Sequence, residues 1–138
     1  MSEASGGIVA GAIVDLDAAA APYAVKIHAG HHALLADEPA SAGGGDAGPS
    51  PFGLLLSSLG ACTAITLRMY AERKKWPLAA VHVRLTYRWE GDAPRIDRTL
   101  SLEGTLDAEQ RARCAEIVEK TPVTRALKRG ITITTTLR

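Results

Sequence analysis

Two cysteines are the side chains of this 138-residue sequence best suited to covalent chemistry. Cys62 and Cys114 are too few for a disulfide framework, and neither has the clustered partners that a zinc site needs. If a thiol matters here, it therefore acts as a nucleophile or a redox group. Cys62 lies about eleven residues, or roughly 16 Å, inside a predicted helix, beyond the first turn in which a helix dipole acts. The alternative is a structural cysteine within a buried helix.

Three histidines near the N-terminus invite a metal-site interpretation. His28, His31 and His32 fall on a predicted strand pair, where alternation directs neighbouring side chains to opposite faces. No carboxylate or cysteine in this stretch completes a ligand set with them. Exposed strand histidines are the better interpretation, so the sequence predicts neither a metal nor a cofactor.

The helix that carries Cys62 has clear boundaries in the sequence. Residues 37–50 are rich in glycine and proline and predict a loop. Ser50-Pro51 is then a typical helix start, because serine can cap an early N–H and proline loses no bond at the first helical position. Residues 52–70 are apolar on nearly every side, which predicts a buried central helix that ends near Lys74. Serines, threonines and Arg68 interrupt any run long enough to span a membrane.

Alternation of apolar and polar residues indicates the strands. It is strict from Val81 to Trp89 and continues from Ile96 to Leu102, which predicts an antiparallel hairpin. Residues 8–35 predict a short strand pair with a two-residue turn at Ala29-Gly30, since glycine tolerates the positive φ of such turns. Residues 131–137 predict a last strand.

The remaining segment is helical in pattern. Asp107 is predicted to cap a helix that directs Cys114 inward, and Pro122 to break it and start a short second helix ending near Lys128. Strands precede and follow the helices without a regular βαβ rhythm, which predicts an α+β class. The length suits a single domain over residues 1–138.

The charge pattern limits the partners. Sixteen basic and fifteen acidic side chains leave a formal charge of +1, so no long-range field attracts a phosphate backbone or an anionic bilayer. Nucleic acid and membrane partners are therefore not expected. The first twenty residues have no basic region followed by an apolar run, as a secretory signal would, and we expect a cytoplasmic protein.

Four stretches of the sequence match the motifs of a known family in order and spacing. They are Gly48-Pro49-Ser50-Pro51-Phe52-Gly53-Leu54-Leu55-Leu56-Ser57-Ser58-Leu59-Gly60-Ala61-Cys62-Thr63, Leu67 to Lys74, Ile96-Asp97-Arg98, and Glu119 to Val123. Together they resemble the OsmC-like family, which includes organic hydroperoxide resistance proteins. The resemblance implies antiparallel sheets packed on a long buried central helix and an intertwined homodimer. It also implies a thiol peroxidase that reduces organic hydroperoxides, with Cys62 as the peroxidatic residue.

The sequence departs from this family pattern at the positions that assist the thiol. The family's resolving cysteine stands in a Cys-Pro-Val step, which here reads Thr121-Pro122-Val123, and threonine cannot form a disulfide. Cys114 lies seven residues earlier, about two helical turns and a full pitch too far to substitute without rearrangement. The resemblance also implies an arginine from the N-terminal sheet that holds the cysteine as thiolate, and a glutamate early in the helix that orients this arginine. Here the helix opens with Phe52-Gly53, and no arginine precedes Arg68.

Three functional hypotheses follow. In the first, the protein is oxidised at Cys62 by peroxides and is reduced by an external thiol in a one-cysteine cycle. In the second, the family's pocket binds a small hydrophobic molecule without catalysis, consistent with Phe52 at its entrance. In the third, the domain serves as a dimerising module. The sequence specifies neither the substrate nor the reductant.

Overall fold

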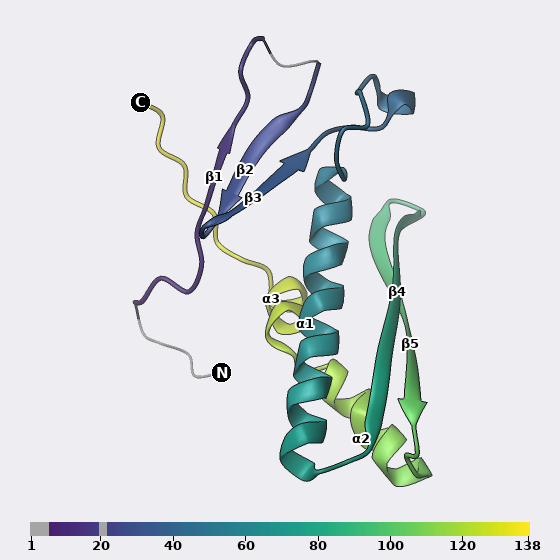
Figure 1. The fold of residues 1–138 in the computed structure, drawn as a ribbon. Coiled ribbons are helices and arrows are strands. Elements are labelled where there is room, and N and C mark those ends of the chain that lie inside the picture. Colours follow the sequence, from purple (N-terminus) through teal and green to yellow (C-terminus); the bar gives the residue numbers. More distant parts are fainter. Residues whose placement is uncertain (1–5, 20–21) are drawn as a thin grey trace. The chain divides into compact units, whose positions relative to one another are not determined.

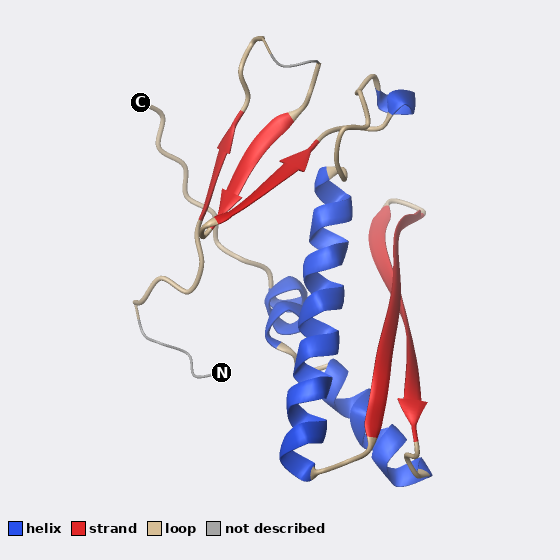
Figure 2. Ribbon diagram, viewed as in Figure 1, coloured by secondary structure: helices blue, strands red, loops and turns tan. Residues whose placement is uncertain are grey.

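A computed structural model describes residues 6–19 and 22–138 of the chain (Figure 1). The chain forms two compact units, one ending at Leu55 and one running from Leu56 to Arg138. Antiparallel strands and helices are segregated along the chain (Figure 2), which confirms the predicted α+β class. That residues 1–138 act as a single domain stays a prediction.

The first unit contains a three-stranded antiparallel sheet in the order β1-β2-β3. Its strands are β1 (Ala12–Asp15), β2 (Val25–Ala29) and β3 (His32–Ala36). The predicted strand pair is present as β2 and β3, but the prediction missed β1, because its glycine- and alanine-rich surroundings show no alternation and only pairing with β2 defines it. The hairpin turn lies at Gly30-His31, one residue later than predicted, with Gly30 at φ 60°.

The predicted loop over residues 37–50 is ordered around one buried carboxylate. Asp37 accepts hydrogen bonds from the backbone N–H groups of Glu38 at 2.7 Å and Ala47 at 3.1 Å, and a short 3-10 helix, η1 (Ala40–Ala42), lies between them. Gly44 is required here, because a Cβ at this position would lie 2.0 Å from the carbonyl oxygen of Glu38. The loop leads directly into the long helix.

Helix α1 (Pro51–Lys74) begins where the sequence predicted, and the Ser50 hydroxyl accepts from the N–H of Gly53 at 3.1 Å. Its predicted burial on every side is wrong for the single chain. Only one stripe at four-residue spacing is buried, formed by Leu59, Thr63, Leu67 and Ala71. By length and composition alone α1 could also cross a membrane, a test that core helices of soluble proteins pass as well.

The second unit packs this stripe against a hairpin and two helices. Strands β4 (Leu78–Glu90) and β5 (Ala93–Gly104) pair antiparallel, which confirms the predicted hairpin, and its turn lies at Gly91-Asp92. Gly60 permits the close approach of α1, since a Cβ there would lie 2.9 Å from Cδ1 of Leu85. The core of this unit is formed by Leu67, Cys114 and Val118, with Trp76, Leu78, Val81, Leu100, Leu102 and Ile117 packed around them.

Both predicted C-terminal helices are present. Asp107 and Gln110 form a reciprocal capping box at the start of α2 (Ala108–Val118), which satisfies two backbone donors. Thr121 is the N-cap residue of α3 (Pro122–Arg129), and Pro122 occupies its first turn. The break between the two helices is therefore the predicted one.

The strand predicted at residues 131–137 is wrong. This segment has neither helix nor strand, and Ile131 and Ile133 are largely exposed. Its alternation is that of a strand, but a strand forms only when a neighbouring strand satisfies its backbone groups. No described strand of the chain pairs with it.

Candidate functional site

Cys62 is half-buried on α1, at the border between the covered and the open side of the helix. Thr63, the next residue, belongs to the buried stripe, while helical periodicity places Cys62 on the same side as Ile65 and Met69. Those two side chains are 53% and 60% exposed. The thiol is therefore not enclosed by the single chain, in contrast to the fully buried helix that the sequence predicted.

Cys114 lies in a different environment. It is 2% exposed in the core of the second unit, packed with Leu67 and Val118. Burial raises the pKa of the Cys114 thiol, and the positive charge of Arg111 only partly opposes this effect. Leu67 follows Cys62 by five residues, which is about 140° around α1 and 7.5 Å along it. The two thiols therefore face different parts of the unit, and both are unpaired cysteines.

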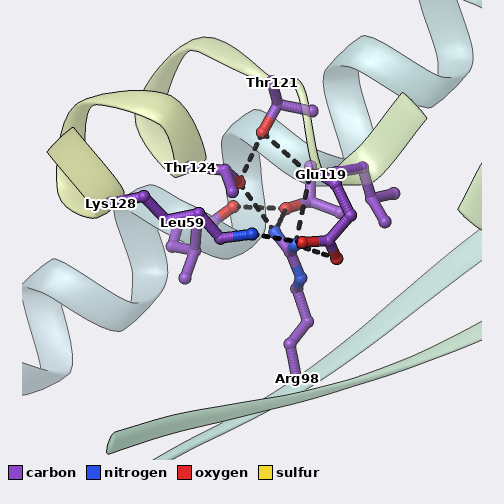
Figure 3. Close-up of polar contacts among 8 residues, drawn as sticks. Leu59, Arg98, Glu119, Thr121, Thr124 and Lys128 are labelled. Atoms are coloured by element: carbon purple, nitrogen blue, oxygen red, sulfur yellow. Dashed lines mark hydrogen bonds and ion pairs between the residues drawn. The ribbon is translucent and has the colours of Figure 1, made fainter. Parts of the chain in front are cut away.

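Thr121, which the sequence resemblance places at a resolving position, is buried and hydrogen-bonded. Its hydroxyl lies 2.6 Å from the hydroxyl of Thr124 and donates to the carbonyl oxygen of Val118 at 3.4 Å. Figure 3 shows these two threonines facing one another at the start of α3. The hydroxyl at position 121 therefore belongs to a polar network rather than to a pair of thiols.

The centre of that network is Arg98 on β5. Its Nη1 donates to the hydroxyls of Thr63 at 3.0 Å and Thr124 at 2.9 Å. Its Nη2 donates to the carbonyl oxygen of Val118 at 3.1 Å and lies 3.4 Å from a carboxylate oxygen of Glu119 (Figure 3). The guanidinium thus joins α1, the end of α2 and the start of α3 to the hairpin.

This network joins Thr121 to Thr63, the residue that follows Cys62. Thr63, which follows Cys62, and Thr124, which pairs with Thr121, bind the same nitrogen of Arg98. The side chain of Arg98 is only 12% exposed. The sequence motif contains Arg98 but does not indicate that it is a functional residue. Alternation along β5 does indicate that its side chain points inward, because Arg98 lies in phase with Ile96 and Leu100.

Glu119 forms the outer edge of the network. Its carboxylate pairs with Lys128 at 2.5 Å and with Arg98 at 3.4 Å. The hydrogen bond from Lys128 is the main cause that lowers the pKa of Glu119, with the charges of Lys128 and Arg98 adding to it and desolvation opposing it. The carboxylate therefore stays ionised at neutral pH.

A groove of about 760 Å³ opens beside these residues in the second unit. Its apolar lining includes Leu59, Tyr87, Ile96 and Leu127. Its polar lining includes Arg98, Glu119, Thr124 and Lys128. The combination of an apolar wall with a few fixed polar groups is typical of sites for small molecules.

The histidines form no comparable site. His28, His31 and His32 are exposed, and the rings of His31 and His32 lie 4.1 Å apart between centroids. No cluster of three or more metal-binding side chains occurs among residues 6–19 and 22–138. His82, on the exposed face of β4, pairs with Glu103.

Comparison with known proteins places these features in context. A family model described as OsmC-like protein matches residues 43–136. An OsmC-like protein from Mycoplasma pneumoniae superposes with a TM-score of 0.72 at 16% identity, over 86% of each chain. An organic hydroperoxide resistance protein OsmC from Legionella pneumophila gives 0.65 at 17% identity, over 88% of this chain and 90% of the other.

The organic hydroperoxide resistance protein OhrB of Bacillus subtilis has the same fold. It superposes with a TM-score of 0.60 at 18% identity, over 88% of this chain and 91% of that protein. A search of curated protein sequences found no match. At 16–18% identity these solved structures show a shared fold, whereas family membership rests on the family model that matches residues 43–136.

Proposed function

This chain belongs to the OsmC-like protein family, and on that premise we propose that it is a thiol protein oxidised at Cys62 by organic hydroperoxides. The observation that carries the proposal is the contrast between its cysteines. Cys62 is half-buried, and so partly accessible, on the helix that the family motif identifies, whereas Cys114 is enclosed in the core. The names of the Legionella and Bacillus relatives support a role in organic hydroperoxide resistance.

The proposed reaction begins with attack of the Cys62 thiolate on the terminal oxygen of the hydroperoxide. The O–O bond breaks, the sulfur becomes a sulfenic acid, and the leaving alkoxide takes up a proton to give the alcohol. An external thiol then condenses with the sulfenic acid, which releases water and leaves a mixed disulfide. A second external thiol attacks the external sulfur of the mixed disulfide. This releases the Cys62 thiolate and a disulfide of the two external thiols.

The need for an external thiol follows from the surroundings of the other candidates. Thr121 carries a hydroxyl, and that hydroxyl is occupied by Thr124 and the carbonyl of Val118. Cys114 packs against a different side of α1 and has a raised pKa, so it is a poor attacking thiol at neutral pH. We therefore propose a one-cysteine cycle.

Intact mass spectrometry tests this proposal. The reduced protein is treated with tert-butyl hydroperoxide in the presence of dimedone, which traps sulfenic acid. We expect one adduct in the wild type and in Cys114→Ala, and none in Cys62→Ser. An adduct that persists in Cys62→Ser, or a wild type that never forms one, contradicts the proposal.

A second candidate function is binding of a small hydrophobic molecule without catalysis, favoured by the groove beside Leu59 and Leu127. Its test is the fluorescence of 8-anilinonaphthalene-1-sulfonate with the native protein. Leu127→Arg should weaken binding, while Leu137→Arg, at a 96% exposed position outside the groove, should not. Equal binding by both variants argues against the groove as a ligand site.

We also propose that the chain is a cytoplasmic homodimer. Apolar side chains that a lone chain leaves exposed on α1, including Ile65 and Met69, support a second copy as their partner. Two unpaired cysteines suit a reducing compartment. Sedimentation equilibrium of the purified protein measures the mass, and a monomer at micromolar concentration contradicts the homodimer.

A further inference from the structure

Arg98 is a nearly enclosed cation whose two terminal nitrogens are both fully engaged. Nη1 binds two threonine hydroxyls, and Nη2 binds the Val118 carbonyl and the Glu119 carboxylate. An arginine with this many directed bonds holds its partners in a fixed geometry, because the guanidinium is planar and its donors form a rigid fork. Lysine cannot reproduce that fork.

Thr63 is the partner that links Arg98 to the thiol region. Thr63 is fully buried, and its hydroxyl donates to the carbonyl oxygen of Leu59 at 2.7 Å. The hydroxyl oxygen of Thr63 also accepts a hydrogen bond from Nη1 of Arg98 at 3.0 Å. The hydroxyl is thus held from two sides. Because Thr63 directly follows Cys62, its position fixes how α1 is turned about its own axis at the thiol.

The rotation of the helix decides the exposure of Cys62. A residue one step along an α-helix lies about 100° further around the axis. With Thr63 held against Arg98, Cys62 falls at the edge of the buried stripe, half-covered. A modest rotation about the axis would carry the thiol further into the open or underneath the hairpin.

We propose that Arg98, acting through Thr63, is a positioning residue for Cys62. This inference rests on the proposed oxidation of Cys62. The guanidinium does not touch the peroxide. It holds the helix so that the thiol stays at one defined angle for in-line attack on the O–O bond. Small misplacements of a reacting group are costly, since a shift of about 1 Å can reduce a rate by roughly 100-fold.

A purely structural role for Arg98 makes a different prediction. General loosening of the fold would expose Cys62 to every reagent, and oxidation and alkylation would then change together. Loss of positioning separates the two reactions, because alkylation by a small neutral maleimide depends mainly on access and on the thiolate, whereas attack on a peroxide also depends on alignment.

The experiment compares both reactions at Cys62 in four variants. Thr63→Val removes the hydroxyl at nearly constant volume, and Thr63→Ser retains it. Arg98→Lys retains the charge without the fork. Arg88→Met removes an exposed arginine of β4, whose ion pairs are with the exposed carboxylates of Glu90 and Asp97, and is the matched control. Rates of dimedone-trapped oxidation by tert-butyl hydroperoxide and of N-ethylmaleimide alkylation are read at Cys62 by peptide mass spectrometry.

We expect oxidation to fall about tenfold or more in Thr63→Val and Arg98→Lys, while alkylation changes less than about threefold. Thr63→Ser and Arg88→Met should match the wild type in both reactions. Circular dichroism and thermal melting verify that each variant is folded. Should Arg98→Lys fail to fold, Thr63→Val carries the test.

Two results would overturn the inference alone. One is an oxidation rate at Cys62 in folded Thr63→Val that equals the wild-type rate. The other is a parallel change of oxidation and alkylation that follows the loss of thermal stability. A wild type that shows no oxidation at Cys62 overturns the proposed function, and the inference with it, so the two failures are distinguishable.

Discussion

The two cysteines of this chain lie in surroundings that differ in every respect relevant to thiol chemistry. Cys114 packs with Leu67 and Val118 in the core of the second unit, and burial raises the pKa of its thiol. Cys62 is half-buried and directly precedes Thr63, whose hydroxyl binds the nearly buried Arg98. The comparison teaches that burial disfavours ionisation of one thiol, whereas the other is partly accessible and adjoins a polar network.

The largest expected effect is a difference in alkylation between the two thiols. In the native protein at neutral pH, Cys62 should react with iodoacetamide at least about 100-fold faster than Cys114, because a buried thiol with a raised pKa is neither accessible nor ionised. Quenched time points analysed by peptide mapping give both rates. Comparable rates in the folded protein would remove the contrast on which the proposed function depends.

The second prediction concerns the resolving position. Thr121→Cys should accelerate turnover of tert-butyl hydroperoxide with a thiol reductant about tenfold, since an internal thiol at high effective concentration outcompetes an external one. Thr121 is joined to Thr63 through Thr124 and Arg98, so a thiol introduced there lies in the neighbourhood of Cys62. Peroxide consumption is measured by ferrous oxidation of xylenol orange. A binding protein would remain silent in this assay.

The third prediction compares the same substitution at both cysteines. Cys114→Ser should lower the free energy of unfolding by about 1–3 kcal/mol, because a hydroxyl enters an apolar cluster. Cys62→Ser should change it by less than about 0.5 kcal/mol, as is usual for partly exposed positions. Urea unfolding followed by circular dichroism gives both values. Equal losses would mean that Cys62 is also a packing residue.

Much of the fold was predictable because its signals are local. Ser50-Pro51, Asp107 and Pro122 each define a helix boundary through a cap or a missing N–H, and each boundary was confirmed. The segment at residues 131–137 failed for the opposite reason. Its alternation describes the side chains, whereas a strand depends on a partner elsewhere.

The candidate site was only half predictable. The motif identifies Cys62 and the threonine at position 121 by their place in the sequence. The role of Arg98 depends on the convergence of three helices on one side chain of β5, which no local pattern records. The sequence likewise predicted a helix buried on all sides, because composition reports apolar residues and not how many of them a single chain covers.

The smallest expected effect separates the rim of the Arg98 network from its interior. Glu119 has a lowered pKa, so its ion pairs stabilise the fold above the unfolded value of about 4.3, and the contribution is lost as the pH falls through the lower folded value. Because the carboxylate is 54% exposed, Glu119→Gln should cost only about 0.3–1 kcal/mol at pH 7. The difference from the wild type should vanish at low pH.

Thr63→Val, in the interior, removes a hydroxyl that both Arg98 and Leu59 bind, which should cost about 1–3 kcal/mol. This cost should persist at low pH, because neither the hydroxyl nor the guanidinium titrates there. Urea unfolding of both variants at pH 7 and at the lowest pH where the wild type stays folded makes the measurement. A pH-independent cost for Glu119→Gln would mean that its carboxylate acts through packing rather than through charge.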